Sequence, residues 1–112
     1  MQRGELWTLQ DESYASKARP VVIIQGDLGD AFDSVILCLL TTFDFSSIST
    51  RVSIKPEPAN GLKKQSFVMT EKIITVARAE LGCRIGSLTD TQMHEINRQI
   101  AKLLAITQED IE

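Results

Sequence analysis

The spacing of apolar residues limits this chain to few architectures. Over the first three quarters, apolar residues occur in short runs, some alternating with polar residues and others continuous and rich in β-branched side chains. Alternation is typical of half-buried strands, short continuous runs fit fully buried strands, and Gly, Pro and Asp mark the turns between them. The pattern therefore predicts strands at residues 5–9, 20–25, 34–40, 51–55 and 66–76.

The last quarter of the chain has a helical period instead. Its apolar residues recur at steps of three and four: Met93, Ile96, Ile100, Leu103 and Leu104. Thr89 fits the N-cap with Gln92 at the third helical position, and Leu88 with Met93 fits a hydrophobic staple. We predict one domain over residues 1–112: a small β-barrel with a C-terminal helix packed on it, and an acidic tail, about residues 107–112, that frays.

Composition excludes several broad classes. The chain has 112 residues, of which 43% are hydrophobic, and a formal net charge of only −3, unlike disordered chains. Its longest apolar runs, residues 21–24 and 35–40, are far shorter than the roughly 20 residues that span a bilayer. No apolar segment follows the single Arg at the N-terminus, so no signal peptide is expected. We expect a cytoplasmic protein that has reduced thiols and no membrane partner.

Histidine and cysteine usage narrows the chemistry. His94 is the only histidine, and the helical register places it on the solvent side. Two-histidine acid–base catalysis within one chain and a multi-histidine zinc site are therefore excluded. Cys38 and Cys83 are 45 residues apart, which is not a metal-type spacing. No glycine-rich phosphate loop of the GxGxxG, GxxxxGKS or GxxxxGKT type occurs, so we expect neither a metal nor another cofactor.

Charge is unevenly distributed along the chain. Residues 51–84 carry 7 basic and 3 acidic side chains, although the chain as a whole is acidic. A basic face on an acidic protein could bind a polyanion. Ordinary solvated lysines on a strand face would give the same pattern, so charge alone leaves both interpretations open.

Six segments, taken in order, carry a resemblance to a known family. They are RGELW at residues 3–7, ARPVVII at 18–24, VILCLLTT at 35–42, GLKKQSFV at 61–68, KIITV at 72–76 and LGCRIGSLT at 81–89. Each segment is short, but the ordered set runs from about residue 2 to 106 and resembles the MazF/PemK family of toxins from bacterial toxin–antitoxin pairs. Those toxins are sequence-specific endoribonucleases.

The resemblance implies a fold, partners and a reaction. The fold would be an SH3-like β-barrel of the CcdB/PemK type, in a homodimer that pairs with a cognate antitoxin protein. The reaction would be metal-independent cleavage of single-stranded mRNA, in which the ribose 2′-hydroxyl attacks the adjacent phosphorus and leaves a 2′,3′-cyclic phosphate and a 5′-hydroxyl. Without a metal, fixed cations and hydrogen-bond donors must stabilise the charge that grows on the phosphorane.

Three residues match positions that act in catalysis in this family. Arg19 matches the catalytic arginine, whose planar guanidinium stays charged and can hold phosphorane oxygens; a surface salt bridge is the alternative. Thr41 matches the active-site threonine at a strand end, where the alternative is a β-branched residue that only finishes the strand. Glu71 stands where PemK-type members place an aspartate proposed as general base, a role that requires burial to raise its pKa. Otherwise Glu71 is a solvent-facing residue beside Lys72.

Four further residues are candidates for RNA binding. Tyr14 and Lys17 lie in the loop of residues 10–18, where an aromatic ring and a cation suit base stacking and phosphate attraction; a solvated loop is the alternative. Thr42 supplies a hydroxyl where the family usually has Ser, and Lys72 contributes a cation of the basic segment.

Two positions depart from the family pattern. Met69 stands where some PemK-type members carry a second catalytic arginine, and Ile74 replaces an arginine that is common in the family. Neither side chain can donate a proton or supply a charge. These departures favour one rival interpretation, a non-catalytic toxin. The other rival is a gyrase-directed toxin that acts through protein binding, because CcdB toxins share the implied fold. The retained pair of Arg19 and Thr41 argues against the gyrase-directed alternative.

Overall fold

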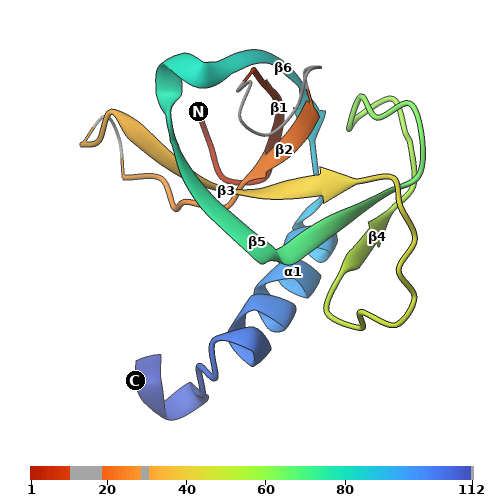
Figure 1. Ribbon diagram of the computed structural model, residues 1–112. Coiled ribbons are helices and arrows are strands. Elements are labelled where there is room, and N and C mark those ends of the chain that lie inside the picture. The colour runs from red at the N-terminus through yellow and green to blue at the C-terminus, as the bar shows by residue number, and fades with distance from the viewer. Residues whose placement is uncertain (11–18, 29–30, 112) are drawn as a thin grey trace.

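In the computed structural model, which describes residues 1–10, 19–28 and 31–111, six strands form one antiparallel sheet and one α-helix follows them (Figure 1). The strands are β1 (Glu5–Leu9), β2 (Arg19–Ile23), β3 (Ser34–Thr41), β4 (Val52–Ile54), β5 (Ser66–Ala77) and β6 (Leu81–Ser87). The helix is α1 (Asp90–Leu103), and short 3₁₀ helices cover Arg78–Glu80 and Gln108–Ile111. The strand order in the sheet is β4-β5-β3-β2-β1-β6.

The longest strand, β5, bends in the middle and so curls the sheet (Figure 1). Val68 pairs with Leu40 of β3 and Ile73 pairs with Cys38, so four residues of β5 lie opposite one residue of β3. Such an excess on one strand bends it and increases the local twist. Residues 69–72 therefore form a corner, and the part of β5 before this corner pairs with β4 as well.

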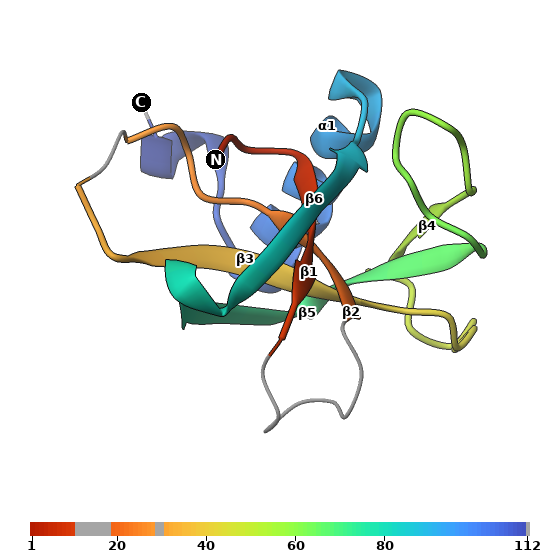
Figure 2. The same ribbon diagram turned by 90° about the horizontal axis from the view of Figure 1, so that it is seen from above.

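A loop after β4 bridges the two edge strands, β4 and β6. The backbone amide of Ser87 donates to the Ala59 carbonyl at 2.9 Å, and a Cβ at Gly61 would lie 2.1 Å from the Ile85 carbonyl oxygen. Gly61 also has a φ of +71°, which glycine adopts without steric cost. With this contact the sheet forms the predicted small β-barrel, which is seen from above in Figure 2.

Neighbouring residues of the strands face two apolar cores. Val22 of β2 belongs to one core, and Val21 and Ile23 belong to the other, because successive side chains of a strand point to opposite faces. Helix α1 covers the first core with Met93 and Ile96. The C-terminal end of the helix projects away from the barrel (Figure 1).

The start of α1 confirms the predicted capping. The amide of Gln92 donates to Thr89 Oγ1 at 3.1 Å, and the amide of Thr89 donates to Gln92 Oε1 at 2.8 Å. Leu88 and Met93, the predicted staple, are both buried. His94 is exposed on this helix, as its register predicts.

Two elements differ from the prediction. The sequence pattern does not predict β6, because Gly82, Cys83 and Arg84 break any apolar alternation and are exposed. Pairing with β1, rather than burial, adds this strand to the sheet. The acidic tail, predicted to fray, contains a 3₁₀ helix at Gln108–Ile111, and the Thr107 amide donates to Asp110 Oδ2 at 2.6 Å.

The two cysteines are free thiols in different environments. Cys38 is buried and Cys83 is exposed, and burial raises the pKa of the Cys38 thiol to about 12. Cys38 therefore acts as a small apolar residue of the core. In the part of the chain that the structure describes, no helix is both long and apolar enough to cross a membrane.

Candidate active site

A pocket of about 830 Å³ opens at one end of the barrel. Four segments meet there: the start of β2 contributes Arg19, the end of β3 contributes Thr41, the loop after β4 contributes Lys63, and β6 contributes Ile85. These segments are far apart in the sequence, and the sheet order and the closing loop bring them together. The pocket contains two of the three residues predicted for catalysis, Arg19 and Thr41, and also Thr42.

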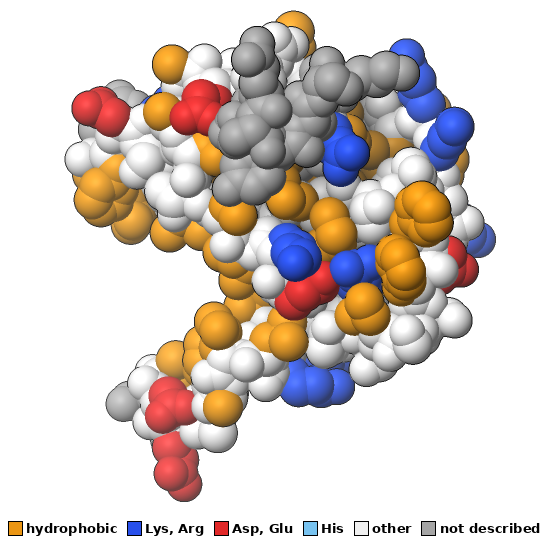
Figure 3. Space-filling view, in the orientation of Figure 1, with side chains coloured by type: hydrophobic (Ala, Val, Ile, Leu, Met, Phe, Trp, Pro, Cys, Tyr) orange, Lys and Arg blue, Asp and Glu red, His pale blue; other side chains and the backbone are white. Residues whose placement is uncertain are grey.

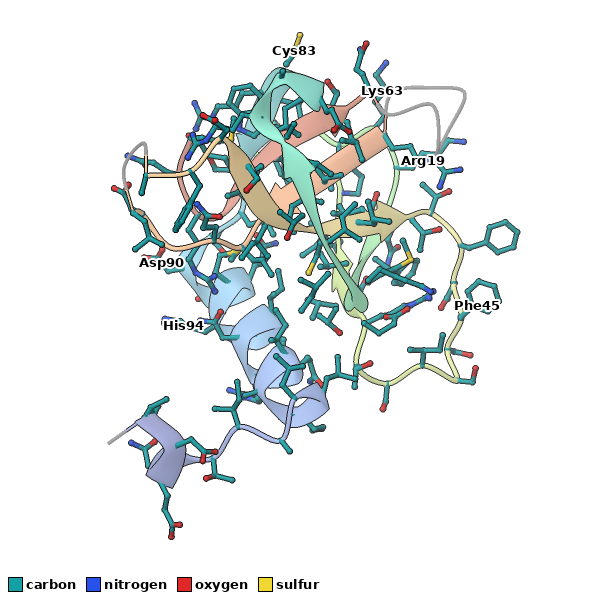
Figure 4. All side chains as sticks on the ribbon, turned by 60° about the vertical axis from the view of Figure 1, so that its left-hand side comes forward. Arg19, Phe45, Lys63, Cys83, Asp90 and His94 are labelled. Carbon is teal, nitrogen blue, oxygen red and sulfur yellow. The ribbon has the colours of Figure 1, made fainter. Side chains whose placement is uncertain are left out.

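Cations dominate the charge at this pocket. Arg19, Lys63 and Lys64 line it and are exposed, and no carboxylate is among the described residues that line it. Figure 4 shows Arg19 and Lys63 on the same side of the molecule. Three positive side chains, with no counter-charge among the described residues of the pocket, form a site suited to a phosphate anion.

The local sequence explains how these cations are positioned. Arg19 and Pro20 begin β2, where a proline without an N–H is tolerated. Leu62 is buried in the first core and anchors the loop after β4. Lys63 and Lys64 follow this anchor directly and are exposed, so they reach the pocket rather than the core.

The Thr41 hydroxyl donates to none of the described residues. Its Oγ1 accepts a hydrogen bond from the Phe43 amide at 3.1 Å, so its own hydroxyl hydrogen remains available to an anion. The hydroxyl of Ser66 at the same pocket instead donates to the Lys64 carbonyl at 3.0 Å. The Thr41 side chain is therefore suited to hold a phosphate oxygen.

Glu71, predicted as the general base, lies at the corner of β5 and is not among the residues that line the pocket. Its Oε2 lies 2.6 Å from Arg51 Nη2, and Arg51 Nε donates to the same oxygen at 3.2 Å. These hydrogen bonds lower the pKa of Glu71 below its ordinary value, although partial burial acts to raise it. A pKa raised by burial, which the general-base role requires, is therefore not found for Glu71 in this structure.

The remaining predicted residues are Lys72, Tyr14 and Lys17. Lys72 is exposed on β5 beside Glu71 and is not among the lining residues. Tyr14 and Lys17 lie outside the described residues, so their roles in RNA binding stay predictions. Ile74, which replaces a family arginine, packs against the second core, so an apolar side chain suits this position.

The site residues that sequence reasoning missed lie in loops. Lys63 and Lys64 belong to the basic segment 51–84, and only the closing loop shows that these two cations, among seven, reach the pocket. Phe43 also lines the pocket. It follows a predicted strand, and no periodicity or motif marks it.

Metal-ligating side chains are not clustered in the described part of this protein. Across residues 1–10, 19–28 and 31–111, no three His, Cys, Asp or Glu side chains come together in a way that could hold a metal ion. His94 on α1 and Cys83 on β6 lie far apart in Figure 4. The groups that the pocket offers to a ligand are cations, hydroxyls and one aromatic ring.

Comparison with known proteins agrees with this geometry. A family model described as PemK-like, MazF-like toxin of type II toxin–antitoxin system matches residues 2–104. The probable endoribonuclease MazF of Mycolicibacterium smegmatis is 39% identical over 107 residues, which cover 95% of this chain and 98% of that protein. The endoribonuclease MazF of Staphylococcus saprophyticus is 29% identical over 106 residues, which cover 89% of this chain and 88% of that protein.

Solved structures show the same fold. An endoribonuclease in complex with its cognate antitoxin, from a mycobacterial species, matches with a TM-score of 0.80 and 26% identity, and the match covers 96% of this chain and 97% of that chain. This likeness confirms the predicted mainly β, SH3-like barrel with a C-terminal helix. Because the family model matches nearly the whole chain, the protein belongs to the PemK/MazF family of toxins of type II toxin–antitoxin systems, as its sequence motifs predict.

Proposed function

We propose that this protein is the toxin of a type II toxin–antitoxin pair and cleaves single-stranded mRNA in the cytoplasm as an endoribonuclease. One observation carries the proposal: Arg19, Lys63 and Lys64 line the same pocket as the Thr41 hydroxyl, and no described carboxylate lines it. The relatives named endoribonuclease MazF support the reaction class.

The reaction would be a transesterification within the RNA strand. The 2′-oxygen forms a bond to the adjacent phosphorus and loses its proton to a base. The bond from phosphorus to the 5′-oxygen breaks, and this oxygen takes up a proton. The products are a 2′,3′-cyclic phosphate and a 5′-hydroxyl. Fixed cations and donors can stabilise the phosphorane without a metal.

The pocket residues divide these tasks. The Arg19 guanidinium would bind the nonbridging oxygens and stabilise the charge that develops there, and the Thr41 hydroxyl would donate to one of these oxygens and align the attack. Lys63 and Lys64 would hold flanking phosphates, with contributions from Thr42, Lys72, Tyr14 and Lys17 along the strand. Glu71 can serve as the base only where Arg51 releases it, because both carboxylate oxygens accept from the guanidinium here.

Two protein partners belong to the proposal. The antitoxin would place an acidic segment on the cations of the pocket and so exclude RNA; the similar endoribonuclease solved with its cognate antitoxin supports such a partner. A second copy of this chain would complete an isologous dimer. Exposed apolar side chains at the projecting end of α1 and in the turn that follows it support a protein contact there: Leu103, Leu104 and Ile106.

RNA cleavage in EDTA tests the proposal. Purified protein free of antitoxin is incubated with a long single-stranded RNA, and the cut sites are mapped by primer extension. We expect cuts at one recurring short motif, lost in Arg19→Ala and retained in Arg98→Ala, which removes an exposed arginine of α1. If the folded wild-type protein leaves the RNA intact, the proposal is wrong, and the non-catalytic and gyrase-directed, CcdB-like alternatives take its place.

A further inference from the structure

Two exposed aromatic rings stand beside the pocket. Phe43 and Phe45 are 70% and 50% exposed, and their rings stack with centroids 5.5 Å apart and planes inclined by 21°. Phe43 also lines the pocket that holds Arg19 and Thr41. Figure 3 shows hydrophobic side chains gathered on the side of the molecule where the loop after β3 lies in Figure 1. The protein thus presents a pair of exposed aromatic rings next to its cationic pocket.

The loop that carries the two rings is held in place at several points. At its start, the Phe43 amide donates to Thr41 Oγ1 at 3.1 Å, and within it the Ile48 amide donates to the Phe45 carbonyl at 2.9 Å. At its end, Thr70 Oγ1 donates to the Thr50 carbonyl at 2.7 Å and ties the loop to the corner of β5. The backbone that carries the rings is therefore held in place without a ligand, which lowers the entropic cost of binding.

The nearly buried Arg51 side chain packs against the Phe45 ring. Its guanidinium carbon lies 5.3 Å from the centroid of the Phe45 ring, within the range of a cation–π contact. The Arg51 side chain is only 9% exposed and is paired with Glu71, and its Nη1 has no hydrogen-bond partner among the described residues. A buried charge pair with an unpaired N–H is a weak source of stability, so a role in positioning the ring accounts for this arrangement better.

We propose that Phe43 and Phe45 form a stacking subsite for one base of single-stranded RNA whose phosphate occupies the neighbouring cationic pocket, with Arg51 and Glu71 as positioning residues. The proposal rests on the proposed function for the identity of its ligand. RNA is favoured over a protein segment because the same surface joins a flat aromatic face to three cations, and a nucleotide joins a flat base to an anion. Stacking on aromatic side chains accepts any base.

Binding of an uncleavable RNA tests the subsite separately from cleavage. The probe is a fluorescein-labelled, fully 2′-O-methylated single strand of about 12 nucleotides and randomised sequence, a length within the usual range for one binding groove. Its blocked 2′-oxygens cannot attack. We expect the double variant Phe43→Ala/Phe45→Ala to bind this probe about 5- to 100-fold more weakly than the wild type, as loss of a stacked base predicts.

Two controls separate stacking from a structural effect. Phe43→Trp keeps a ring and should retain the affinity, whereas Phe32→Ala removes another half-exposed phenylalanine, at the opposite end of β3, and should have no effect.

The double variant should keep the wild-type dependence of affinity on salt concentration, because the phosphate contacts remain. Arg51→Met should weaken binding by a smaller factor than the double variant, because the rings remain but Phe45 loses its support.

The outcomes distinguish this proposal from the proposed function. Unchanged affinity of the double variant for the probe overturns the subsite, whether or not the wild type cleaves RNA, and leaves the aromatic pair as a contact for a protein segment. A wild type that binds the probe through these rings but does not cleave RNA supports the subsite and contradicts the nuclease. A wild type that does not bind the probe overturns the subsite.

Discussion

The carboxylate of Glu71 lies 2.6 Å from the guanidinium of Arg51, and this ion pair joins the corner of β5 to the residue that precedes β4. The pair is outside the pocket that contains Arg19 and Thr41. Glu71 is therefore bound to a cation of its own chain and does not line the pocket. Arg51 also lies over the Phe45 ring. Glu71, which the sequence predicts as a catalytic base, is therefore linked through Arg51 to the aromatic pair of Phe43 and Phe45.

Glu71→Gln should destabilise the fold at neutral pH. Arg51 stays nearly buried in this variant and loses its charged partner, so we expect the free energy of unfolding to fall by about 1–2 kcal/mol at pH 7. Because the pKa of Glu71 is lowered in the folded protein, its contribution is present above the ordinary Glu pKa and is lost as pH falls through the folded value. Urea unfolding should show the difference at pH 7 and a smaller one near pH 3. Equal differences at both pH values would contradict the ion pair as the cause.

The same substitution separates the two roles of Glu71 in cleavage. A general base contributes about 10²- to 10⁴-fold to the rate, whereas a residue that only positions Arg51 and Phe45 affects RNA binding more than the chemical step. We expect Glu71→Gln to raise KM for RNA and to change kcat by less than about tenfold. The measurement is the pH dependence of kcat in both proteins. Loss of the acidic limb of this profile in Glu71→Gln would establish Glu71 as the base after all.

Thr41→Val should disable cleavage while leaving the protein folded. Valine has nearly the same shape but removes the hydroxyl donor that we assign to the phosphate, and loss of one such donor costs about 10²- to 10³-fold in kcat. Thr41→Ser retains the hydroxyl and should keep most of the activity. Kinetics of RNA cleavage and thermal unfolding of both variants provide the test. Equal kcat for the valine and serine variants would remove Thr41 from the mechanism.

Lys63→Ala and Lys64→Ala should each change the salt dependence of RNA binding. A cation that contacts a phosphate of a single strand contributes about 0.7 to the slope of log K against log salt concentration. Each variant should therefore lower that slope by about this amount, measured with the methylated probe. Lys102→Ala on α1, where the lysine is exposed, is the matched control and should keep the wild-type slope. A wild-type slope in both loop variants would place the RNA elsewhere.

Gly61→Ala should open the barrel where β6 meets the loop after β4. Alanine at a φ of +71° is strained, and its Cβ would lie 2.1 Å from the Ile85 carbonyl oxygen, so we expect a loss of about 2 kcal/mol or more in unfolding free energy. Gly26→Ala is the control, because nothing lies within 4 Å of its Cβ position. Urea denaturation compares the two variants. A Gly61→Ala protein as stable as Gly26→Ala would show that the loop is not clamped there.

The elements predicted best are those whose signal is local. The alternation of residues 5–9 and the helical steps from Met93 to Leu104 depend on neighbours within one or two turns, and the capping pair of Thr89 and Gln92 is separated by three residues. These signals predict β1 and α1 correctly. β6 was missed because its partner β1 lies about 80 residues earlier, and pairing rather than apolar periodicity maintains it.

The amino-acid sequence by itself determined the family of this protein, its mainly β character, its helix start and the presence of Arg19 and Thr41. Only the tertiary structure decided which residues act together. It placed Lys63 and Lys64 at the same pocket as Arg19 and paired Glu71 with Arg51. The physical reason is that charge pairing and pocket formation depend on distances in space. The separation of two residues along the sequence does not specify these distances, because a strand can bend and a loop can close a sheet.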